Sequence, residues 1–470
     1  MSRVAMAMLV LVAACSPVKA PADECTTAAQ CTDPALPFCI DTHCVARCGG
    51  DSDCGDPDRP VCASDGVCVG CQDATDCSVA APVCDAATHA CRGCSAESEC
   101  AGGICIDADG VCAADVAVAF VTQMGADTGT CPRAAPCATI TYALGQLGER
   151  HVIHVLGGSL NTATVILKEN PGLVLDGEDT TLNAGNAATL GLQDQADATV
   201  EGFRLNIPTN VTGVPVPAIS VTGPAHARFH DVQIEGSGGI ALATSLGAQV
   251  AIAHAHVGSL SASSSNQISC SGSKVSVSES VLDTTIVGGS GSSCELTVTR
   301  NRFESSFDGS VQISDGQLLM ENNLIIHRDG FNDSILATGL RPGSTIRFNT
   351  IVNTTALSSD GAALSCDTSV LVTSNVFAYN SGHPITGTGC QTRFSVFDDK
   401  ATTGAGTGNH LTGIEQIFVN RSGGDYHLAP ASVARAAAEP GLDMVTTDFE
   451  GSPRPSPAGT TADCGAFEAP

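Results

Sequence analysis

The segment LTVTRNRF, residues 296–303, carries a pattern that the chain repeats three more times. The pattern returns as LLMENNLII at 318–326, STIRFNTIV at 344–352 and VLVTSNVF at 370–377. Each copy reads apolar, any, apolar, any, any, Asn, any, apolar, and the asparagines are 22, 26 and 26 residues apart. Apolar residues at every second position are typical of β-strands with one buried face. A period near 25 residues indicates a solenoid in which each repeat adds one coil.

The same spacing continues toward the N-terminus, where other residues stand at the asparagine position. These residues are Ser280, Ala255, Val232 and Phe203, at steps of 21, 25, 23 and 29 residues. Scarce Leu and the lack of helical periodicity exclude leucine-rich repeats, and a propeller blade needs roughly 40 residues or more. The pattern therefore predicts an all-β chain that forms a right-handed parallel β-helix solenoid.

Two cysteine pairs, Cys270 with Cys294 and Cys366 with Cys390, are each separated by 24 residues. Residues one coil apart lie about 4.8 Å from each other, and a disulfide needs Cα atoms roughly 4.4–6.8 Å apart. We therefore expect both pairs to join adjacent coils, the alternative being buried free thiols. By the same stacking, a repeated asparagine can hydrogen-bond to the amides above and below it.

Both ends of the repetitive segment resemble those of secreted bacterial β-helix proteins of the pectate-lyase-like class. The resemblance rests on FVTQMGADTGTCPRAAPCATITYAL (120–144), DYHLAP (425–430), DFEGSPRP (448–455) and DCGAFE (463–468). It implies a β-helix with an N-terminal cap at 116–405 and a closing segment at 406–470. Cys131 and Cys137 are expected to close a loop before the amphipathic cap, whereas Cys464 has no evident partner. No activity is implied, because this fold carries lyases, hydrolases, adhesins and inert spikes.

Residues 25–115 contain sixteen cysteines in four units of four, each opening with the spacing C-x5-C. Apolar residues are too few for a core, so disulfides must hold each small unit, and three pairings per unit remain open. The spacing resembles myxobacterial-type repeats, found in stalks of surface proteins of predatory and gliding bacteria, and more loosely the Dickkopf N-terminal module. The segment is acidic, and a solvated acidic face explains it better than a calcium or zinc site.

The chain begins MSRVAMAMLVLVAACSP, in which one Arg precedes a short apolar run. The run cannot span a bilayer as a helix and suits a secretory signal. Its end, VAAC, resembles the lipobox of bacterial lipoproteins, which implies a signal peptide at 1–14 and lipidation of Cys15, followed by a linker at 15–24. Because Ser16 rather than Asp follows the cysteine, we expect a lipid-anchored protein of the outer membrane or cell surface.

The formal net charge is −28. A phosphate backbone needs Lys and Arg to neutralise it, so nucleic acid is excluded as a partner. The same charge disfavours binding to an anionic membrane surface, which leaves the lipid anchor as the expected membrane contact.

A polar cluster falls on neighbouring coils, and it comprises Arg300, Arg302, Glu304, Glu321, His327, Arg328, Asp329 and Asp333. Arg302 and Glu304 flank Phe303 and should point outward together. Such a face could be a carbohydrate groove with acid–base potential, and the alternative is an ordinary charged face. Apart from Asp398 and Asp399, which follow the last copy of the pattern, the paired-Asp, G-H-G and R-x-K patterns of pectin-degrading enzymes are absent, so no catalytic residue is assigned.

A second cluster contains His226, His230, Asp231, His254 and His256. Imidazole and carboxylate groups could bind zinc or another transition metal. Isolated surface histidines are commoner than metal ligands, so no metal and no other cofactor is predicted.

These features favour a non-catalytic surface protein that presents its β-helix for adhesion or glycan binding. Its partner would be an extracellular polysaccharide or a surface protein, although three Tyr and no Trp leave few platforms for sugar stacking. One alternative is a carbohydrate-active enzyme, a polysaccharide lyase or glycoside hydrolase, that uses the face bearing Arg300. A second alternative is a purely structural envelope protein.

Overall fold

The structure is a computed structural model, and the chain divides into two compact units, Met1–Cys112 and Ala113–Pro470. The described residues are 38–40, 43–45, 48, 50–54, 56–185, 187–208, 215–236, 239–259, 266–289, 292–304, 309–327, 333–353, 362–378, 384–398, 406–442 and 444–470. Within these described residues both units are built from β-strands and contain almost no helix, as the sequence predicts.

The described part of the first unit contains the hairpin of β1 and β2 and then three disulfide-bonded repeats, each with a 3-10 turn followed by a two-stranded hairpin. In the three repeats between Cys48 and Cys112 the first cysteine bonds to the third and the second to the fourth, which resolves the pairing that the spacing left open there, whereas the pairing of Cys25, Cys31, Cys39 and Cys44 lies outside the described residues. The bonds are Cys48–Cys62, Cys54–Cys68, Cys71–Cys84, Cys77–Cys91, Cys94–Cys105 and Cys100–Cys112. The elements are β1 (Phe38–Ile40), β2 (His43–Val45), η2 (Asp51–Asp53), β3 (Val61–Cys62), β4 (Cys68–Val69), η3 (Ala74–Asp76), β5 (Val83–Asp85), β6 (Ala90–Arg92), η4 (Glu97–Glu99), β7 (Gly103–Ile106) and β8 (Val111–Ala114).

The acidic residue before the second cysteine caps the 3-10 turn of its repeat. Asp76 accepts a hydrogen bond from the backbone amide of Gln72 at 2.7 Å, and Glu99 accepts one from the amide of Ser95 at 2.8 Å. The Arg92 guanidinium and the Ser95 amide lower the pKa of Glu99 to about 2. These carboxylates therefore have a structural role in small repeats that are held together by disulfides.

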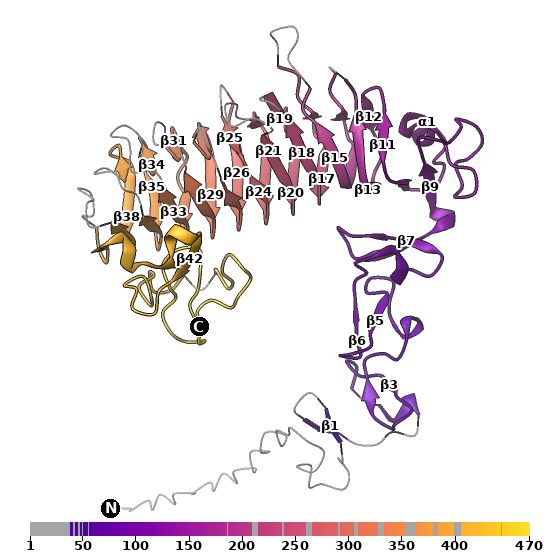
Figure 1. The fold of residues 1–470 in the computed structure, drawn as a ribbon, viewed down its shortest axis with the longest axis horizontal. Coiled ribbons are helices and arrows are strands. Elements are labelled where there is room, and N and C mark those ends of the chain that lie inside the picture. The colour runs from indigo at the N-terminus through magenta and orange to yellow at the C-terminus, as the bar shows by residue number, and fades with distance from the viewer. Residues whose placement is uncertain are drawn as a thin grey trace, which may run out of the picture. The chain divides into compact units, whose positions relative to one another are not determined.

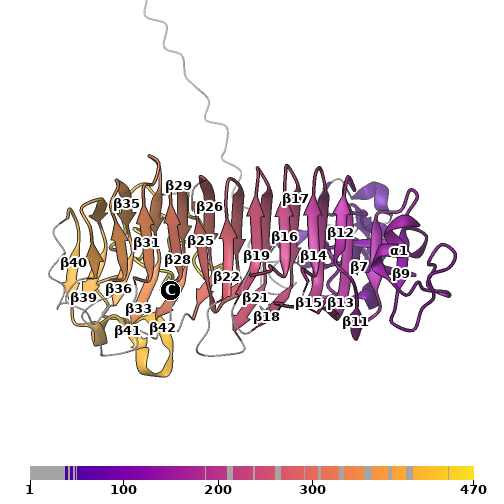
Figure 2. The same cartoon turned by 90° about the horizontal axis from the view of Figure 1, so that it is seen from above.

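The second unit winds into a parallel β-solenoid whose strands stack in three sheets (Figures 1 and 2). Sheet 1 contains β9 (Val118–Val121), β10 (Val152–Val155), β13 (Leu173–Asn183), β15 (Asp197–Asn206), β17 (His226–His230), β20 (Gln249–Ala253), β23 (Lys274–Ser278), β26 (Cys294–Thr299), β29 (Gly316–Glu321), β32 (Thr345–Arg347), β35 (Val370–Thr373) and β38 (Cys390–Arg393). Sheet 2 contains β11 (Ser159–Asn161), the ends of β13 and β15, β18 (Gln233–Gly236), β21 (His256–Ser259), β24 (Val281–Leu282), β27 (Arg302–Phe303), β30 (Leu324–His327), β33 (Thr350–Asn353), β36 (Val376–Ala378), β39 (Val396–Asp398) and β40 (His410–Thr412). Sheet 3 contains β12 (Val165–Lys168), β14 (Leu190–Gln193), β16 (Ile219–Thr222), β19 (Gly239–Ser245), β22 (Asn266–Cys270), β25 (Thr284–Gly288), β28 (Val311–Ser314), β31 (Ile335–Thr338), β34 (Leu364–Cys366) and β37 (Ile385–Thr386).

Inward side chains stack in register and form a continuous apolar core along the solenoid. One column of sheet 1 shows the pattern, with Val200, Phe229, Ile252, Val277, Val298, Met320, Ile346 and Val372 directly above one another. All of them are buried. Alternate residues of each strand point outward, which is the arrangement that the period-2 pattern predicts.

The asparagine ladder, which consists of Asn301, Asn323, Asn349 and Asn375, lies at the corner between sheets 1 and 2. All four side chains are fully buried. The Oδ1 of Asn349 accepts hydrogen bonds from the backbone amide and the Nδ2 of Asn323, at 3.0 and 2.8 Å. Each asparagine thus supplies an acceptor for a backbone amide of the preceding coil. The predicted ladder is confirmed.

Two disulfides, Cys270–Cys294 and Cys366–Cys390, join adjacent coils, with Cα–Cα distances of 5.8 and 5.2 Å. The pairs are those expected, but the argument that their members are vertical neighbours is wrong. Cys270 lies level in sheet 3 with Gly288, whereas Cys294 begins β26 of sheet 1. Each disulfide therefore runs diagonally across a corner, from the end of a sheet 3 strand to the start of a sheet 1 strand. In the coil between Cys270 and Cys294 a single residue separates β24 from β25. Equivalent positions of this coil and its neighbour are therefore fewer than 24 residues apart in sequence.

Before the first complete coil, η5 (Asp115–Ala117) leads into β9, and the helix α1 (Ile140–Gly145) follows. The Thr139 hydroxyl accepts a hydrogen bond from the Tyr142 amide and starts the helix. Ile140 and Ala143 are buried against the solenoid core. The disulfide Cys131–Cys137 closes the loop before the helix.

The outward face of sheet 2 changes from polar to apolar along the solenoid. One vertical column contains, in order, Arg204, Gln233, His256, Val281, Arg302, Leu324, Thr350, Val376 and Val396. From Leu324 onward this column is buried although it points away from the core. The last coils therefore need a cover on this side.

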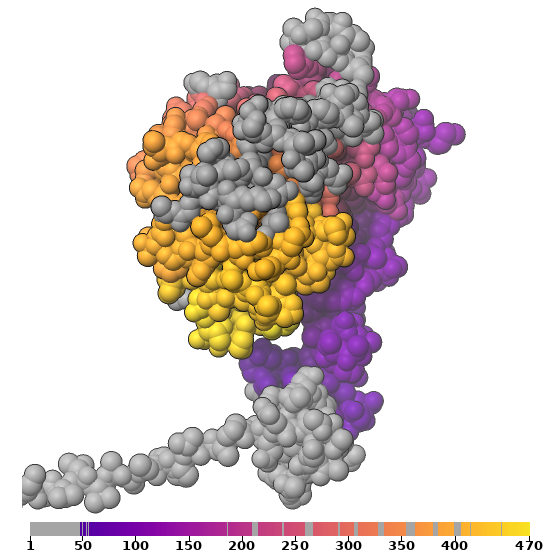
Figure 3. All heavy atoms as spheres, turned by 60° about the vertical axis from the view of Figure 1, so that its left-hand side comes forward, coloured from indigo at the N-terminus to yellow at the C-terminus, as the bar shows by residue number. Residues whose placement is uncertain are grey.

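Residues 414–470, the C-terminal segment, supply that cover (Figures 1 and 3). The segment contains η6 (Ile414–Gln416), β41 (Phe418–Asn420), η7 (Arg421–Gly423) and β42 (Asp425–Leu428). Its apolar residues form a second core with the outward face of sheet 2, and this core includes Phe418, Tyr426 and Phe467. The segment thus lies along the flank of the solenoid, and its edge meets sheet 2 near Arg302.

Candidate functional site

Charged residues gather where each coil turns from sheet 1 into sheet 2. Asp231, His254, Glu279 and Arg300, the corner column, have φ between 50° and 54° in successive coils. A left-handed conformation costs a non-glycine residue roughly 1–2 kcal/mol. It is held by hydrogen bonds to the next coil, such as that from the Arg300 amide to the Glu321 carbonyl at 3.1 Å. Since these side chains leave the core, the corner presents one polar group in each of these four coils.

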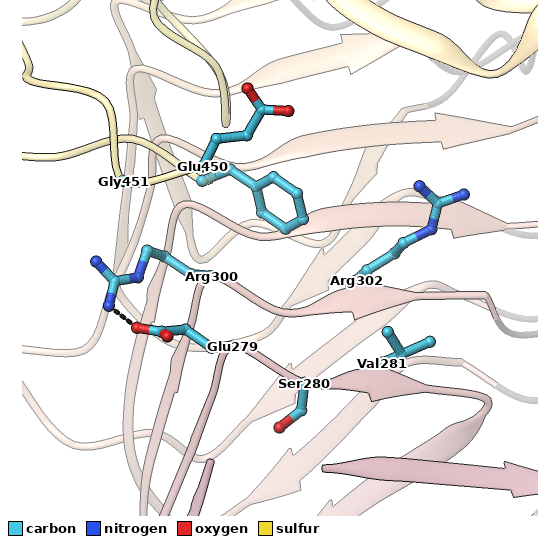
Figure 4. Close-up of a pocket in the computed structure, with 8 residues that line it drawn as sticks. Glu279, Ser280, Val281, Arg300, Arg302, Glu450 and Gly451 are labelled. Atoms are coloured by element: carbon cyan, nitrogen blue, oxygen red, sulfur yellow. Dashed lines mark hydrogen bonds and ion pairs between the residues drawn. The ribbon is translucent and has the colours of Figure 1, made fainter. Parts of the chain in front are cut away.

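The corner column pairs along the solenoid axis and forms one side of a pocket. The His254 Nε2 lies 3.1 Å from the Glu279 carboxylate, which also pairs with Arg300. Two residues further on, the Arg302 Nε donates to Glu304 at 2.6 Å. Arg300 and Arg302 lie on two sides of a pocket of about 340 Å³, and Glu450 belongs to the opposite wall, with its carboxylate directed away from both arginines (Figure 4). This arginine pocket is lined by Glu279, Ser280, Val281, Arg300, Arg302, Phe449, Glu450 and Gly451.

A loop of the C-terminal segment forms the other wall of the pocket. Thr447 ties the loop to the solenoid, because its hydroxyl accepts from Arg300 at 3.2 Å and its carbonyl accepts from Asn322 at 2.8 Å. Phe449 follows and is half-buried, with its ring centroid 5.3 Å from that of Phe467. The wall thus offers the pocket a partly exposed aromatic ring that is fixed by packing.

Glu450 supplies the carboxylate of the same wall. Its carboxylate lies 3.1 Å from the Nε2 of His427, whose Nδ1 lies 2.7 Å from Asp425. Partial burial lowers the pKa of His427, but the hydrogen bonds and charges of the two carboxylates outweigh it and raise the pKa overall. The wall is therefore held to β42 by a charged contact.

A second hollow, of about 570 Å³, shares Arg302 with the arginine pocket. Ile326, Arg421 and Tyr426 line it, and Arg421 lies 3.4 Å from Glu415 at its rim. Because Arg302 lines both hollows, they lie next to each other between sheet 2 and the C-terminal segment.

Two residues of the predicted polar cluster, Arg300 and Arg302, line this pocket, and a third, Glu304, pairs with Arg302. Glu321 instead turns to the next coil, where both of its oxygens accept hydrogen bonds from Arg347 at 3.0 Å. Both side chains of this pair are mostly buried. The pair therefore links two coils rather than lining the arginine pocket.

The other predicted members lie elsewhere or outside the described residues. His327 is fully buried at an inward position of β30, where strand alternation places it on the same side as Ile325. Asp333 lies before β31 and accepts a hydrogen bond from the Ala362 amide at 2.7 Å, so it belongs to sheet 3. Arg328 and Asp329 lie outside the described residues.

The five residues considered as metal ligands are spread over two faces and a corner. His226 points outward from sheet 1 and His256 from sheet 2, while Asp231 and His254 belong to the corner column. The rings of His230 and His254 lie 4.9 Å apart. Over the ranges that the structure describes, these five do not bring three ligand atoms within 4.8 Å of one another.

Sheet 3 offers a long outward face of a different kind. Its middle outward column is Ile166, Gly191, Ser220, Ala243, Ser269, Val287, Gln312, Leu336 and Ser365. Within these described strands the column contains no Asp, Glu, Arg or His. The column therefore supplies no acid–base pair for hydrolysis or elimination.

Cys15 and the signal at 1–14 lie outside the described residues, so lipidation stays a prediction. In the part of the chain that is described, no helix has the length and apolar character needed to cross a membrane. A scan against protein-family models and a search of curated proteins each find no match. The functional argument therefore depends on the geometry of the chain itself.

Proposed function

We propose that this protein is an exported, lipid-anchored surface protein that binds extracellular glycans through the arginine pocket without modifying them. The lipobox-like VAAC ending at Cys15 supports export and anchoring. The disulfides support an oxidising location, since such bonds persist outside the cytoplasm. The disulfide-bonded repeats would belong to the stalk type of gliding bacteria, and the solenoid to a non-catalytic branch of the pectate-lyase-like class.

The observation that carries this proposal is the composition of the pocket around Phe449. Sugar rings have an apolar C–H face and a rim of hydroxyl groups, so proteins hold them with an aromatic ring and planar polar groups. Phe449 offers the ring, Arg300 and Arg302 offer donors, and Glu279 and Glu450 offer acceptors. Two positive and two negative side chains balance, which favours a neutral sugar. A volume of about 340 Å³ suits a single ring, and the adjoining hollow gives room for further units.

The pairing of the charged groups favours binding over catalysis. A glycoside hydrolase needs a protonated carboxylic acid beside a second carboxylate, and a lyase needs a base. Here the two arginines of the pocket each pair with a carboxylate, Arg300 with Glu279 and Arg302 with Glu304. A paired guanidinium stays protonated and acts as a hydrogen-bond donor. The arrangement is therefore suited to recognition.

A glycan array probed with the full-length protein in detergent would identify the ligand, and calorimetry on the best hit would test the pocket. We expect Phe449→Ala and Arg302→Ala each to weaken binding by about tenfold or more, through loss of stacking and of charge-assisted hydrogen bonds. Incubation with the same glycan should release no shortened or unsaturated product.

The matched control is Arg204→Ala. Arg204 occupies the same outward column as Arg302 in an earlier coil, and it also has a carboxylate partner, Asp179 at 3.7 Å. Its removal should leave binding unchanged, and circular dichroism should show that all variants are folded. Equal binding by all four proteins would exclude the pocket, and product release would favour the enzyme.

A further inference from the structure

His427 lies between two carboxylates that come from different parts of the C-terminal segment. Its Nδ1 is 2.7 Å from Asp425 on the same strand, and its Nε2 is 3.1 Å from Glu450 in the pocket wall. An ionised carboxylate only accepts hydrogen bonds, so both contacts require an N–H on each ring nitrogen. This is the imidazolium form. Neutral imidazole has one N–H and can keep only one of the two bonds.

The bond to Asp425 is the one that the neutral ring would keep. The two residues share β42, and the same Asp425 oxygen accepts from the His427 backbone amide at 3.1 Å. Glu450 is on a loop, and its side chain is half-exposed. Loss of the proton therefore releases Glu450 first.

We infer that protonated His427 holds Glu450 in the wall of the arginine pocket, which makes His427 a pH-dependent positioning residue for the ligand site. The inference deepens the proposed function and rests on it only for the effect on binding. The position of Glu450 can be tested without a ligand.

The groups that face His427 come from three elements. Asp425 comes from β42, Glu450 from the pocket loop, and Phe467 from the end of the chain, with its ring centroid 4.6 Å from the imidazole. The nearby Asp448 and Glu468 carboxylates accept hydrogen bonds from backbone amides within the segment. Phe467 also packs on Phe449. The imidazole is therefore in contact with Glu450 itself and with the ring that supports Phe449.

The direction of the pH effect follows from the raised pKa of His427 in the folded chain. A group of this kind contributes its full stabilisation below its unfolded value of 6.5 and loses it as pH rises through the folded value. Glu450 is therefore held at acidic pH and released at alkaline pH. The affinity of the pocket should fall in the same direction.

The test is an NMR titration of the intact protein with labelled histidine, in which the His427 signal is assigned from its absence in His427→Gln. Glu450→Gln should lower the His427 midpoint. Glu415→Gln, which removes another exposed carboxylate of the same segment, should leave it unchanged. Amide exchange of residues 446–452, corrected for intrinsic rates, should lose about two- to fivefold protection across the titration, and His427→Gln should show the low value at every pH.

Calorimetry from pH 5.5 to pH 8.5 with the array hit completes the experiment. As pH rises, the glycan affinity of the wild type should fall by the same factor as the amide protection. The affinity of His427→Gln should not change with pH. An unchanged His427 midpoint in Glu450→Gln would overturn the inference. A glycan affinity that does not depend on pH, although the amides of residues 446–452 lose protection, would also overturn it. If no glycan binds at any pH but the midpoint and exchange behave as expected, the proposed function fails and the link between His427 and Glu450 stands.

Discussion

Replacing Arg454 with Ala should destabilise the second unit by about 3–5 kcal/mol, because it removes the cation from a buried group of charges. The Arg454 side chain is almost fully buried, and it donates to the backbone carbonyls of Asp463 and Gly465 at 3.2 and 3.0 Å. Its guanidinium lies 4.4 Å from the ring centroid of Phe348 and 3.4 Å from the Glu468 carboxylate. Without it, Glu468 would remain buried beside other acids.

The loss of stability in Arg454→Ala should depend on pH. Burial raises the pKa of Glu468 even with Arg454 present, and removal of the cation should raise it further. A carboxyl group with a raised folded pKa favours the folded state at acidic pH, so the deficit of the variant should shrink as pH falls toward 4.

Unfolding in guanidinium chloride measures the loss of stability in Arg454→Ala. It is followed by circular dichroism, since the chain has no Trp for fluorescence. Arg435→Ala is the control, because this arginine of the same segment makes an exposed contact to the Pro470 carbonyl at 2.8 Å. It should cost less than about 1 kcal/mol. Similar costs for the two variants would show that the buried charges do not hold the cover in place.

Replacing Asn349 with Ala should cost about 3 kcal/mol or more, because several buried polar groups would lose their partners at once. The Asn349 Nδ2 donates to the carbonyls of Met320 and Arg347, at 3.0 and 2.9 Å. Its Oδ1 accepts the backbone amide of Asn323, which would have no acceptor in the variant. The corner around Asn349 packs directly on the corners of the two adjacent coils. We therefore expect no water molecule to replace the lost hydrogen bonds.

An exposed asparagine pair on sheet 2 provides the control for Asn349→Ala. Asn206 donates to Asn183 at 2.7 Å in adjacent coils, so it makes a ladder contact in the presence of solvent. Asn206→Ala should change the unfolding free energy by no more than about 0.5 kcal/mol. A comparable loss in both variants would mean that stacking itself, and not burial of the amide, determines the contribution of the ladder.

The solenoid could be predicted from sequence because its coils repeat a short, strongly constrained pattern. Apolar residues at fixed offsets set the register of every coil from Phe203 to Asn375, and an asparagine at one position marks the last four. The spacing of 24 residues predicts both cysteine pairs correctly but not the course of the bonds, because the loops between strands vary in length. The diagonal course of the Cys270–Cys294 bond is the result of that variation.

The site could be predicted only in part, because half of it comes from residues far away in sequence. The sequence predicts that Arg302 and Glu304 point outward together, but Phe449 and Glu450 follow Arg300 by about 150 residues and belong to the closing motif DFEGSPRP. A signal for the cover does exist in the sequence. After Asn323 the alternation of apolar and polar residues gives way to the continuous apolar run LII, which indicates a strand buried on both faces. Which segment buries the second face depends on long-range packing.

A crystal structure of the protein soaked with the best glycan of the array tests the central claim most directly. The account predicts a sugar ring stacked on Phe449, with its hydroxyl groups bonded to Arg302 and Glu450 and any further units extending past Arg302 toward Arg421. A glycan bound instead on the outward face of sheet 1 or sheet 3, with the arginine pocket holding only solvent, would contradict it.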